Sequence, residues 1–117
     1  MTNLRMGTIE SKFAEIIWNN EPIPSPELVK LTAISLDWKK STTYTVLKKL
    51  CLKGIFQNEK GTVKSVMSKN DYYSMLIEEI LDEGFNNSLS EFIQVFIKRK
   101  NFSDNEIDEI IEVITKK

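Results

Sequence analysis

The 117-residue sequence contains no histidine, one cysteine, four glycines and three prolines. Histidine is the usual general base near neutral pH and the commonest metal ligand, so catalysis by serine–histidine or cysteine–histidine pairs is excluded. The single Cys51 excludes a disulfide framework or a cysteine-rich zinc site within one chain. A chain this short can hardly enclose a catalytic pocket. We therefore predict a protein that is not an enzyme, with no catalytic residues, no metal and no cofactor.

Long apolar runs are also missing. The longest are three residues, as in Ile16-Ile17-Trp18, far short of the roughly 18 that a membrane-spanning helix needs. The first twelve residues lack the apolar core of a secretory signal. We therefore expect a cytoplasmic protein with no direct membrane binding.

Charge is divided unevenly along the chain. Residues 1–69 carry eleven Lys and Arg against six Asp and Glu, a net of +5, whereas residues 70–117 carry five against eleven, a net of −6. A basic segment favours polyanions, and an acidic segment is repelled by them. Charge alone leaves open that both segments are simply solvated helix surfaces, so the spacing of the apolar residues has to decide.

Three amphipathic helices are predicted in the basic segment. Apolar residues at helical spacing predict the first over about residues 8–19. Ser25 before a proline has the form of a helix N-cap followed by a first-turn proline, so a second helix is expected from there to about residue 33. A third helix ends at Gly54. Its apolar positions, spaced i, i+3, i+4, i+7 and i+8, are Thr43, Val46, Leu47, Leu50 and Cys51.

A β-hairpin is expected after the third helix. Residues 55–57 and 63–66 have the pattern of two short strands around a turn that contains Lys60 and Gly61. Three helices followed by a hairpin make a winged helix-turn-helix, a mainly α fold with a small β-hairpin wing, over residues 1–69. Core packing, rather than base stacking or a redox role, is expected for Trp18, Trp38 and Cys51.

The third helix has a second face, opposite its apolar stripe, which is polar, basic and free of acidic residues. The N-terminal end of such a helix fits the major groove of B-DNA, where hydroxyl groups reach base edges and an aromatic edge can touch thymine methyl groups. We expect Thr42, Tyr44 and Thr45 to contact bases and the lysines to pair with phosphates. The candidate DNA-binding residues are Lys39, Lys40, Ser41, Thr42, Tyr44, Thr45, Lys48, Lys49, Lys60 and Lys64. The alternative function is a protein-interaction module whose third helix docks a partner with an acidic surface.

Residues 70–117 are predicted to form three more amphipathic helices, separated near Gly84 and by a capping box that begins at Ser103. Fewer than fifty residues cannot comfortably make a core of their own, so their apolar stripes need a cover, and a second copy of the segment can supply it. The candidate dimerisation residues are Tyr73, Leu76, Ile77, Ile80, Leu81, Leu89, Phe92, Ile93, Phe96, Ile97, Ile107, Ile110, Ile111 and Ile114. The alternative is that these helices pack back on the first part in one globule, without a hinge at residues 69–71.

The order of these motifs resembles that of the penicillinase repressor family, over nearly the whole chain from about Met6. The resemblance rests on Ile16-Ile17-Trp18-Asn19-Asn20-Glu21-Pro22-Ile23, on Glu27-Leu28-Val29, on Trp38 with Thr42-Thr43-Tyr44-Thr45-Val46-Leu47-Lys48-Lys49-Leu50, on Lys53-Gly54 and Gly84-Phe85, and on the Ser103 capping box. It implies a dimeric winged-helix repressor that binds a palindromic, double-stranded DNA operator and dimerises through its C-terminal helices. In antibiotic-resistance members it further implies release through a membrane-bound sensor metalloprotease, with a cut in the dimerisation lobe that falls here on Val95-Phe96.

The sequence departs from the family pattern at several positions. Lys39-Lys40 stand where the family has Ser-Pro before the recognition helix, Thr62 stands where a wing arginine is usual, and Val95 stands where an asparagine precedes the cleavable bond. The paired Cys-x-Cys motifs of the copper-responsive relatives are absent, which excludes copper sensing by that device.

Overall fold

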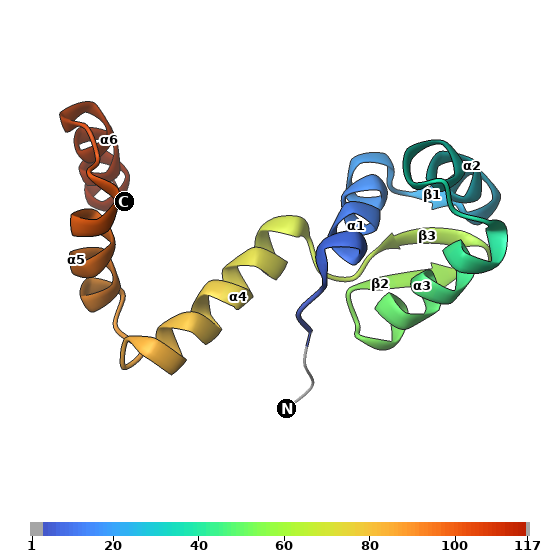
Figure 1. The fold of residues 1–117 in the computed structure, drawn as a ribbon, viewed down its shortest axis with the longest axis horizontal. Coiled ribbons are helices and arrows are strands. Elements are labelled where there is room, and N and C mark those ends of the chain that lie inside the picture. Colours follow the sequence, from blue (N-terminus) through green and yellow to red (C-terminus); the bar gives the residue numbers. More distant parts are fainter. Residues whose placement is uncertain (1–3, 117) are drawn as a thin grey trace. The chain divides into compact units, whose positions relative to one another are not determined.

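The computed structural model describes residues 4–116, which form six helices and a small antiparallel sheet (Figure 1). In chain order the elements are α1 Thr8–Asn20, β1 Ile23–Pro24, α2 Ser25–Leu36, α3 Lys40–Leu52, β2 Phe56–Glu59, β3 Thr62–Ser65, α4 Lys69–Gly84, α5 Leu89–Lys100 and α6 Asp104–Thr115. This confirms the predicted fold class, mainly α with a β-hairpin wing and C-terminal helices. Within the described range, no helix has the length and hydropathy needed to cross a membrane.

The three N-terminal helices begin close to where the sequence predicts. In α1 the backbone N–H of Gly7 donates to Glu10 Oε1 over 3.0 Å, which completes the first turn. The prediction that Ser25 caps α2 is wrong, because Pro24 occupies the N-cap position and Ser25 is the first helical residue. The helix also runs three residues beyond the predicted end, to Leu36, where Asp37 takes a left-handed conformation with φ of 56°.

The sheet has three strands in the order β1-β3-β2, rather than the two of a simple hairpin. The sequence did not predict β1, a two-residue strand in a proline-rich stretch, which pairs antiparallel with β3 through Ile23 and Val63. The hairpin between β2 and β3 closes on Lys60 and Gly61, with φ of 53° and 85°. Positive φ at both central residues is the two-residue turn that matches strand twist.

The core lies between α1, α2, α3 and the sheet (Figure 1). Trp38 packs its ring 5.2 Å from that of Phe13, and Trp18 lies 5.3 Å from Phe56. The predicted core positions of both tryptophans and of Cys51 are confirmed, since all three are partly buried against this cluster. The fully buried apolar side chains include Phe13, Ile17, Leu28, Leu50, Ile55, Phe56, Val63 and Tyr72.

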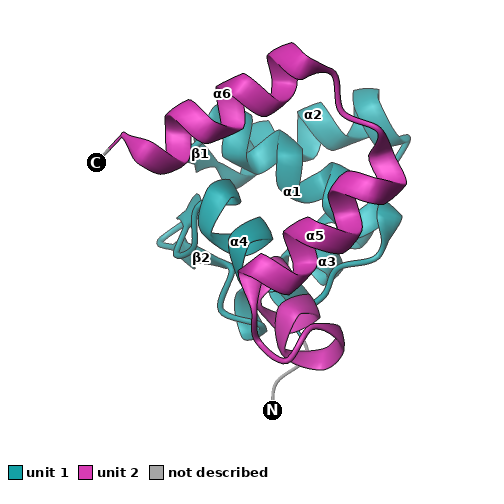
Figure 2. Ribbon diagram, turned by 90° about the vertical axis from the view of Figure 1, so that its left-hand side faces the viewer, with its two compact units in different colours: residues 1–76 teal, residues 77–117 magenta. Residues whose placement is uncertain are grey.

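The chain divides into two compact units after Leu76 (Figure 2). The predicted hinge at residues 69–71 is instead the first turn of α4, and the division falls seven residues later. Tyr72 explains the shift, because its side chain is only 1% exposed and belongs to the core of the first unit. Unit 1 denotes residues up to Leu76 and unit 2 residues from Ile77 onward.

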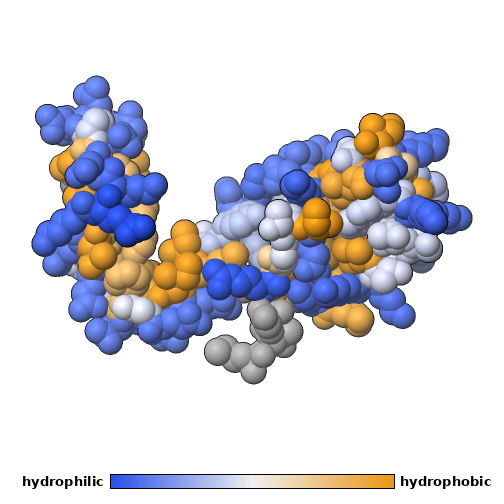
Figure 3. Space-filling model, viewed as in Figure 1, coloured by the Kyte–Doolittle hydropathy of each residue, from blue (hydrophilic) through white to orange (hydrophobic). Residues whose placement is uncertain are grey.

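Unit 2 is organised around a row of aromatic rings. Phe85 lies 5.3 Å from Phe92, which stacks 5.1 Å from Phe96, which in turn lies 5.7 Å from Phe102. The predicted capping box of α6 is confirmed, since Ser103 Oγ accepts from the Glu106 N–H and the Glu106 carboxylate accepts from the Ser103 N–H. Neither α5 nor α6 contains a buried residue, and apolar side chains lie on the molecular surface (Figure 3).

Candidate nucleic-acid interface

Helix α3 presents the two faces that its sequence predicts. Thr43, Leu47 and Leu50 are buried on one side. The opposite side has no carboxylate, and its exposed residues are Lys39, Lys40, Ser41, Thr42, Thr45 and Lys48. Lys39 is the N-cap of α3 and makes no side-chain capping bond. Cations at a helix N-terminus oppose the helix dipole, so these lysines do not serve the stability of α3.

Two buried threonines fix α3 against α2. Thr43 Oγ1 lies 2.6 Å from Thr32 Oγ1, and Thr32 also donates to the carbonyl of Val29. Both hydroxyls are fully buried, where an unmade hydrogen bond is costly, so the pair favours a single register between the two helices. The helical period places Thr43 on the apolar face but does not identify its partner, and a threonine within an otherwise apolar stripe is the only local sign of a buried hydrogen bond.

Tyr44 is held differently from its neighbours on the exposed face. Its ring is half-buried against the core, and its hydroxyl donates to Ser25 Oγ over 3.0 Å. Ser25 is itself buried, so the residue expected to cap α2 instead anchors α3. Thr45 is exposed, and its hydroxyl donates to the carbonyl of Ser41 over 2.9 Å. The hydroxyl of Tyr44 is thus engaged within the protein, whereas its ring edge borders the exposed face.

Lys49 lies on the side of α3 that meets α1. Its ammonium forms an ion pair with Glu10 Oε2 at 3.2 Å. The pKa of Glu10 is lowered, chiefly by the hydrogen bond from the Gly7 N–H and further by Lys49 and Lys53, against an opposing effect of burial. The structure therefore separates Lys49 from the other lysines of α3, because its charge is already partnered within the protein.

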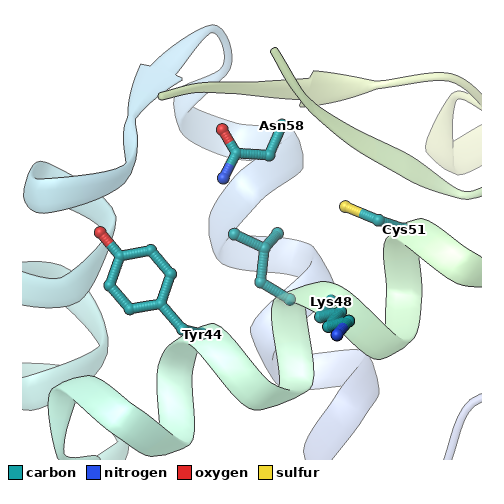
Figure 4. A pocket seen from close by; sticks show the side chains of 5 residues that line it. Tyr44, Lys48, Cys51 and Asn58 are labelled. Atoms are coloured by element: carbon teal, nitrogen blue, oxygen red, sulfur yellow. The ribbon is translucent and has the colours of Figure 1, made fainter. Parts of the chain in front are cut away.

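The wing contributes two exposed lysines. Lys60 occupies the tip of the hairpin and Lys64 lies on β3. A hollow of about 370 Å³ separates α3 from the wing, lined by Tyr44, Leu47, Lys48, Cys51 and Asn58. In Figure 4, Tyr44, Lys48 and Cys51 project from α3 and Asn58 lies opposite, on β2. Asn58 was missed by the sequence analysis, because nothing local indicates that β2 faces α3.

Burial raises the pKa of the Cys51 thiol at the edge of this hollow. A raised pKa keeps the thiol protonated near neutral pH, and the thiolate is the reactive form. Among the described residues, no cluster of histidine, cysteine or acidic side chains could hold a metal ion.

The candidate dimerisation residues fall into two groups. Tyr73 and Leu76 belong to unit 1, and the remainder to unit 2. Half-buried side chains within the chain are Leu76, Leu81, Phe92, Ile93, Phe96 and Ile107. Exposed ones are Tyr73, Ile77, Ile80, Leu89, Ile97, Ile110, Ile111 and Ile114. Val113, which the sequence analysis left out, is 74% exposed and joins the exposed group. Val95 and Phe96, the candidate cleavage position, lie in the middle of α5.

Comparison with known proteins agrees with this architecture. The family model described as "Penicillinase repressor" matches residues 6–116. The chain is 24% identical over 114 residues to the "Penicillinase repressor" of Bacillus licheniformis, an alignment that covers 94% of this chain and 89% of the relative. It is 19% identical over 116 residues to the "Methicillin resistance regulatory protein MecI" of Staphylococcus aureus. That alignment covers 96% of this chain and 94% of the relative. The chain belongs to the penicillinase repressor family, whose members are transcriptional regulators and not enzymes.

Proposed function

We propose that the chain is a sequence-specific, DNA-binding transcriptional repressor that binds a palindromic operator as a homodimer. The observation that carries the proposal is the exposed face of α3, where Lys40, Ser41, Thr42 and Thr45 are exposed and no carboxylate is present. Membership of a family of transcriptional regulators supports the same conclusion.

In the proposed complex, the N-terminal turns of α3 enter the major groove, where short hydroxyl side chains can reach base edges. Thr42, exposed in the first turn, is the leading candidate for a base contact. Tyr44 contributes through its ring edge, which can touch a thymine methyl group, because its hydroxyl is engaged with Ser25. Lys39, Lys40 and Lys48 pair with phosphates.

Two copies of this surface are brought together, in the proposal, by unit 2. Its exposed apolar side chains and the acidic charge of its segment suit a protein partner and not DNA. A two-fold dimer presents two α3 helices to an inverted repeat, with half-site centres about one helical turn apart or a multiple of it.

The names of the two relatives suggest what the repressor controls. One is a penicillinase repressor and the other a methicillin resistance regulatory protein. We propose that this chain regulates genes of antibiotic resistance and is released through a membrane-bound sensor metalloprotease. A cut at Val95-Phe96 would require the middle of α5 to unwind, since proteases take extended backbone. Sequencing the fragments formed on co-expression with such a sensor tests this step, and an intact chain would contradict it.

The proposed DNA binding is tested by a mobility-shift series with the DNA upstream of the protein's own gene. With about three phosphate contacts per subunit, from Lys39, Lys40 and Lys48, the logarithm of the affinity should fall against the logarithm of salt concentration with a slope of about −5. Thr42→Ala should reduce the preference for operator over random DNA by about tenfold, whereas Tyr44→Phe should leave it unchanged. Absent or salt-insensitive binding would contradict the proposal and favour a protein partner for α3.

A further inference from the structure

The first two turns of α4 are built into unit 1 by hydrogen bonds to the N-terminal segment. Tyr72 is 1% exposed, and its hydroxyl accepts from the Met6 N–H over 2.8 Å. The same hydroxyl donates to the carbonyl of Leu4 over 3.1 Å. One buried phenol therefore holds two backbone groups more than sixty residues away in the sequence.

An aromatic cluster holds the same turns against the sheet. Tyr72 lies 5.9 Å from Trp18 and 5.1 Å from Tyr73, and Trp18 in turn lies 5.3 Å from Phe56 on β2. The indole N–H of Trp18 donates to the carbonyl of Met67, just before α4. Phe56 also lies in the strand that faces α3, so the cluster connects the first turns of α4 to the elements that support the recognition helix.

The hydroxyl of Tyr72 has a role that its ring does not need. A phenylalanine at this position would fill the same apolar space, but it could neither accept from Met6 nor donate to Leu4. A buried backbone N–H without an acceptor costs free energy, so the hydroxyl selects the one orientation in which both groups are satisfied. The bond pair therefore constrains how the first turns of α4 meet the N-terminal segment, in addition to stabilising the fold.

We propose that Tyr72 is a positioning residue for operator recognition, whose hydroxyl fixes the direction in which α4 leaves unit 1 and thereby the separation of the two recognition helices. The inference rests on the proposed function, because it requires a dimer joined through unit 2 and a palindromic operator. In such a dimer the two winged-helix units are connected through α4.

The length of α4 makes this position sensitive. From Tyr72 to Gly84 the helix advances about 18 Å at about 1.5 Å per residue. A tilt of about 10° at Tyr72 would move the far end by about 3 Å, close to the roughly 3.4 Å rise of one base pair. Loss of the hydroxyl should therefore broaden the range of half-site spacings that the dimer accepts.

The test compares wild type with Tyr72→Phe and, as a matched control that also removes one hydroxyl from α4, Ser74→Ala. Ser74 lies two residues further along the same helix, and its side chain is exposed. Wild type first selects its preferred duplex from a random library. The spacing between the half-sites is then changed one base pair at a time, which rotates one site by about 34° each step. A duplex with one half-site is measured alongside, and amide exchange at Met6 reports the hydrogen bond directly.

Support for the proposal requires a specific pattern. One base pair from the optimum, wild type and Ser74→Ala should lose at least about tenfold in affinity, and Tyr72→Phe less than about threefold. Affinity for the single half-site should stay within about twofold in all three proteins, and Met6 exchange should accelerate only in Tyr72→Phe. Should Tyr72→Phe fail to fold, a chain without residues 1–4 replaces it, because it lacks the Leu4 carbonyl that accepts from the Tyr72 hydroxyl.

Two results would overturn the positioning role. An unchanged spacing profile in Tyr72→Phe would show that the hydroxyl does not determine the separation of the recognition helices. Equal losses on the single half-site and the palindrome would show that it only stabilises the fold. A wild-type protein that selects no palindrome would refute the proposed function itself, and the inference with it. That outcome is seen with wild type alone, so it can be told apart from a failure of the positioning role, which is seen only in Tyr72→Phe.

Discussion

Unit 1 buries twelve apolar side chains among the described residues, whereas α5 and α6 of unit 2 bury none. Both units have amphipathic helices of similar length, so the difference is not one of local pattern. In unit 1 the apolar faces of the helices pack against one another and against the sheet. In unit 2 the apolar faces of α5 and α6 remain accessible to solvent. Short segments without enclosed cores usually need a partner for stability.

Exposed large apolar side chains occur on all three helices of unit 2, and α6 carries the most exposed of them. Ile111 is 53% exposed, Val113 74% and Ile114 59%. A shallow hollow of about 250 Å³ is lined by Glu109, Ile110, Val113 and Ile114. A second copy of unit 2 could cover these apolar side chains, so the stability of unit 2 should depend on protein concentration. Unit 1 has its own core and should unfold independently of protein concentration.

The largest expected effect comes from Phe13→Ala in the core of unit 1. Removing this fully buried ring should lower the free energy of unfolding by about 3–5 kcal/mol. Both tryptophans lie in unit 1, so urea denaturation followed by tryptophan fluorescence isolates its transition. Phe96→Ala, in the aromatic row of unit 2, is the control and should leave that fluorescence midpoint nearly unchanged. Equal shifts in both variants would show that the two units unfold together.

The next effect concerns the open face of unit 2. Ile111→Asp should raise the dimer dissociation constant at least about a hundredfold, because a buried, unpaired carboxylate is costly at an apolar interface. Sedimentation equilibrium at micromolar concentration measures it. Ile34→Asp, on α2, is the control, since Ile34 is 84% exposed and lies in unit 1. A wild-type protein that is already monomeric, or a dimeric Ile111→Asp variant, would contradict the assignment of the dimer interface.

A smaller effect separates two adjacent lysines of α3. Lys48→Ala should weaken binding to all DNA sequences alike and reduce the steepness of the salt dependence by about two units, one for each subunit of the dimer. Lys49→Ala should leave that slope nearly unchanged and should instead lower stability, because Lys49 is paired with Glu10. Mobility shifts over a salt series, with thermal denaturation of each variant, distinguish the two. Equal slopes for the two variants would restore Lys49 to the DNA-binding group.

The sequence predicts the helical faces of this protein well because they are local. Thr43, Leu47 and Leu50 recur with the helical period, and that period alone assigns them to the buried side of α3. The Ser103 capping box is similarly contained within four residues. Features that depend on one segment and its near neighbours in sequence can therefore be predicted from the sequence alone.

The features that were missed join distant segments. β1 is a two-residue strand whose partner on β3 lies forty residues away, and its proline gives no strand signal. Ser25 carries a strong capping pattern, but Tyr44 engages its hydroxyl across nineteen residues. The division of the chain falls after Leu76, and not at residues 69–71, for the same reason, since Tyr72 is held by the N-terminal segment. Pairing over such distances is determined by the tertiary fold.

The smallest effect is the pH dependence contributed by Glu10 to unit 1. Its pKa in the folded protein is lowered from an ordinary value of 4.5, so its stabilising contribution is present above that value and is lost as the pH falls through the folded pKa. Glu10→Gln should therefore lower stability by about 1 kcal/mol at pH 7 and by a smaller amount at pH 3, as measured by urea denaturation at both values. Glu27→Gln is the matched control, because both members of its pair with Lys30 are largely exposed and should contribute little at either pH. A Glu10→Gln deficit that is as large at pH 3 as at pH 7 would show that the side chain acts through packing and not through the interactions of its charge with the Gly7 N–H, Lys49 and Lys53.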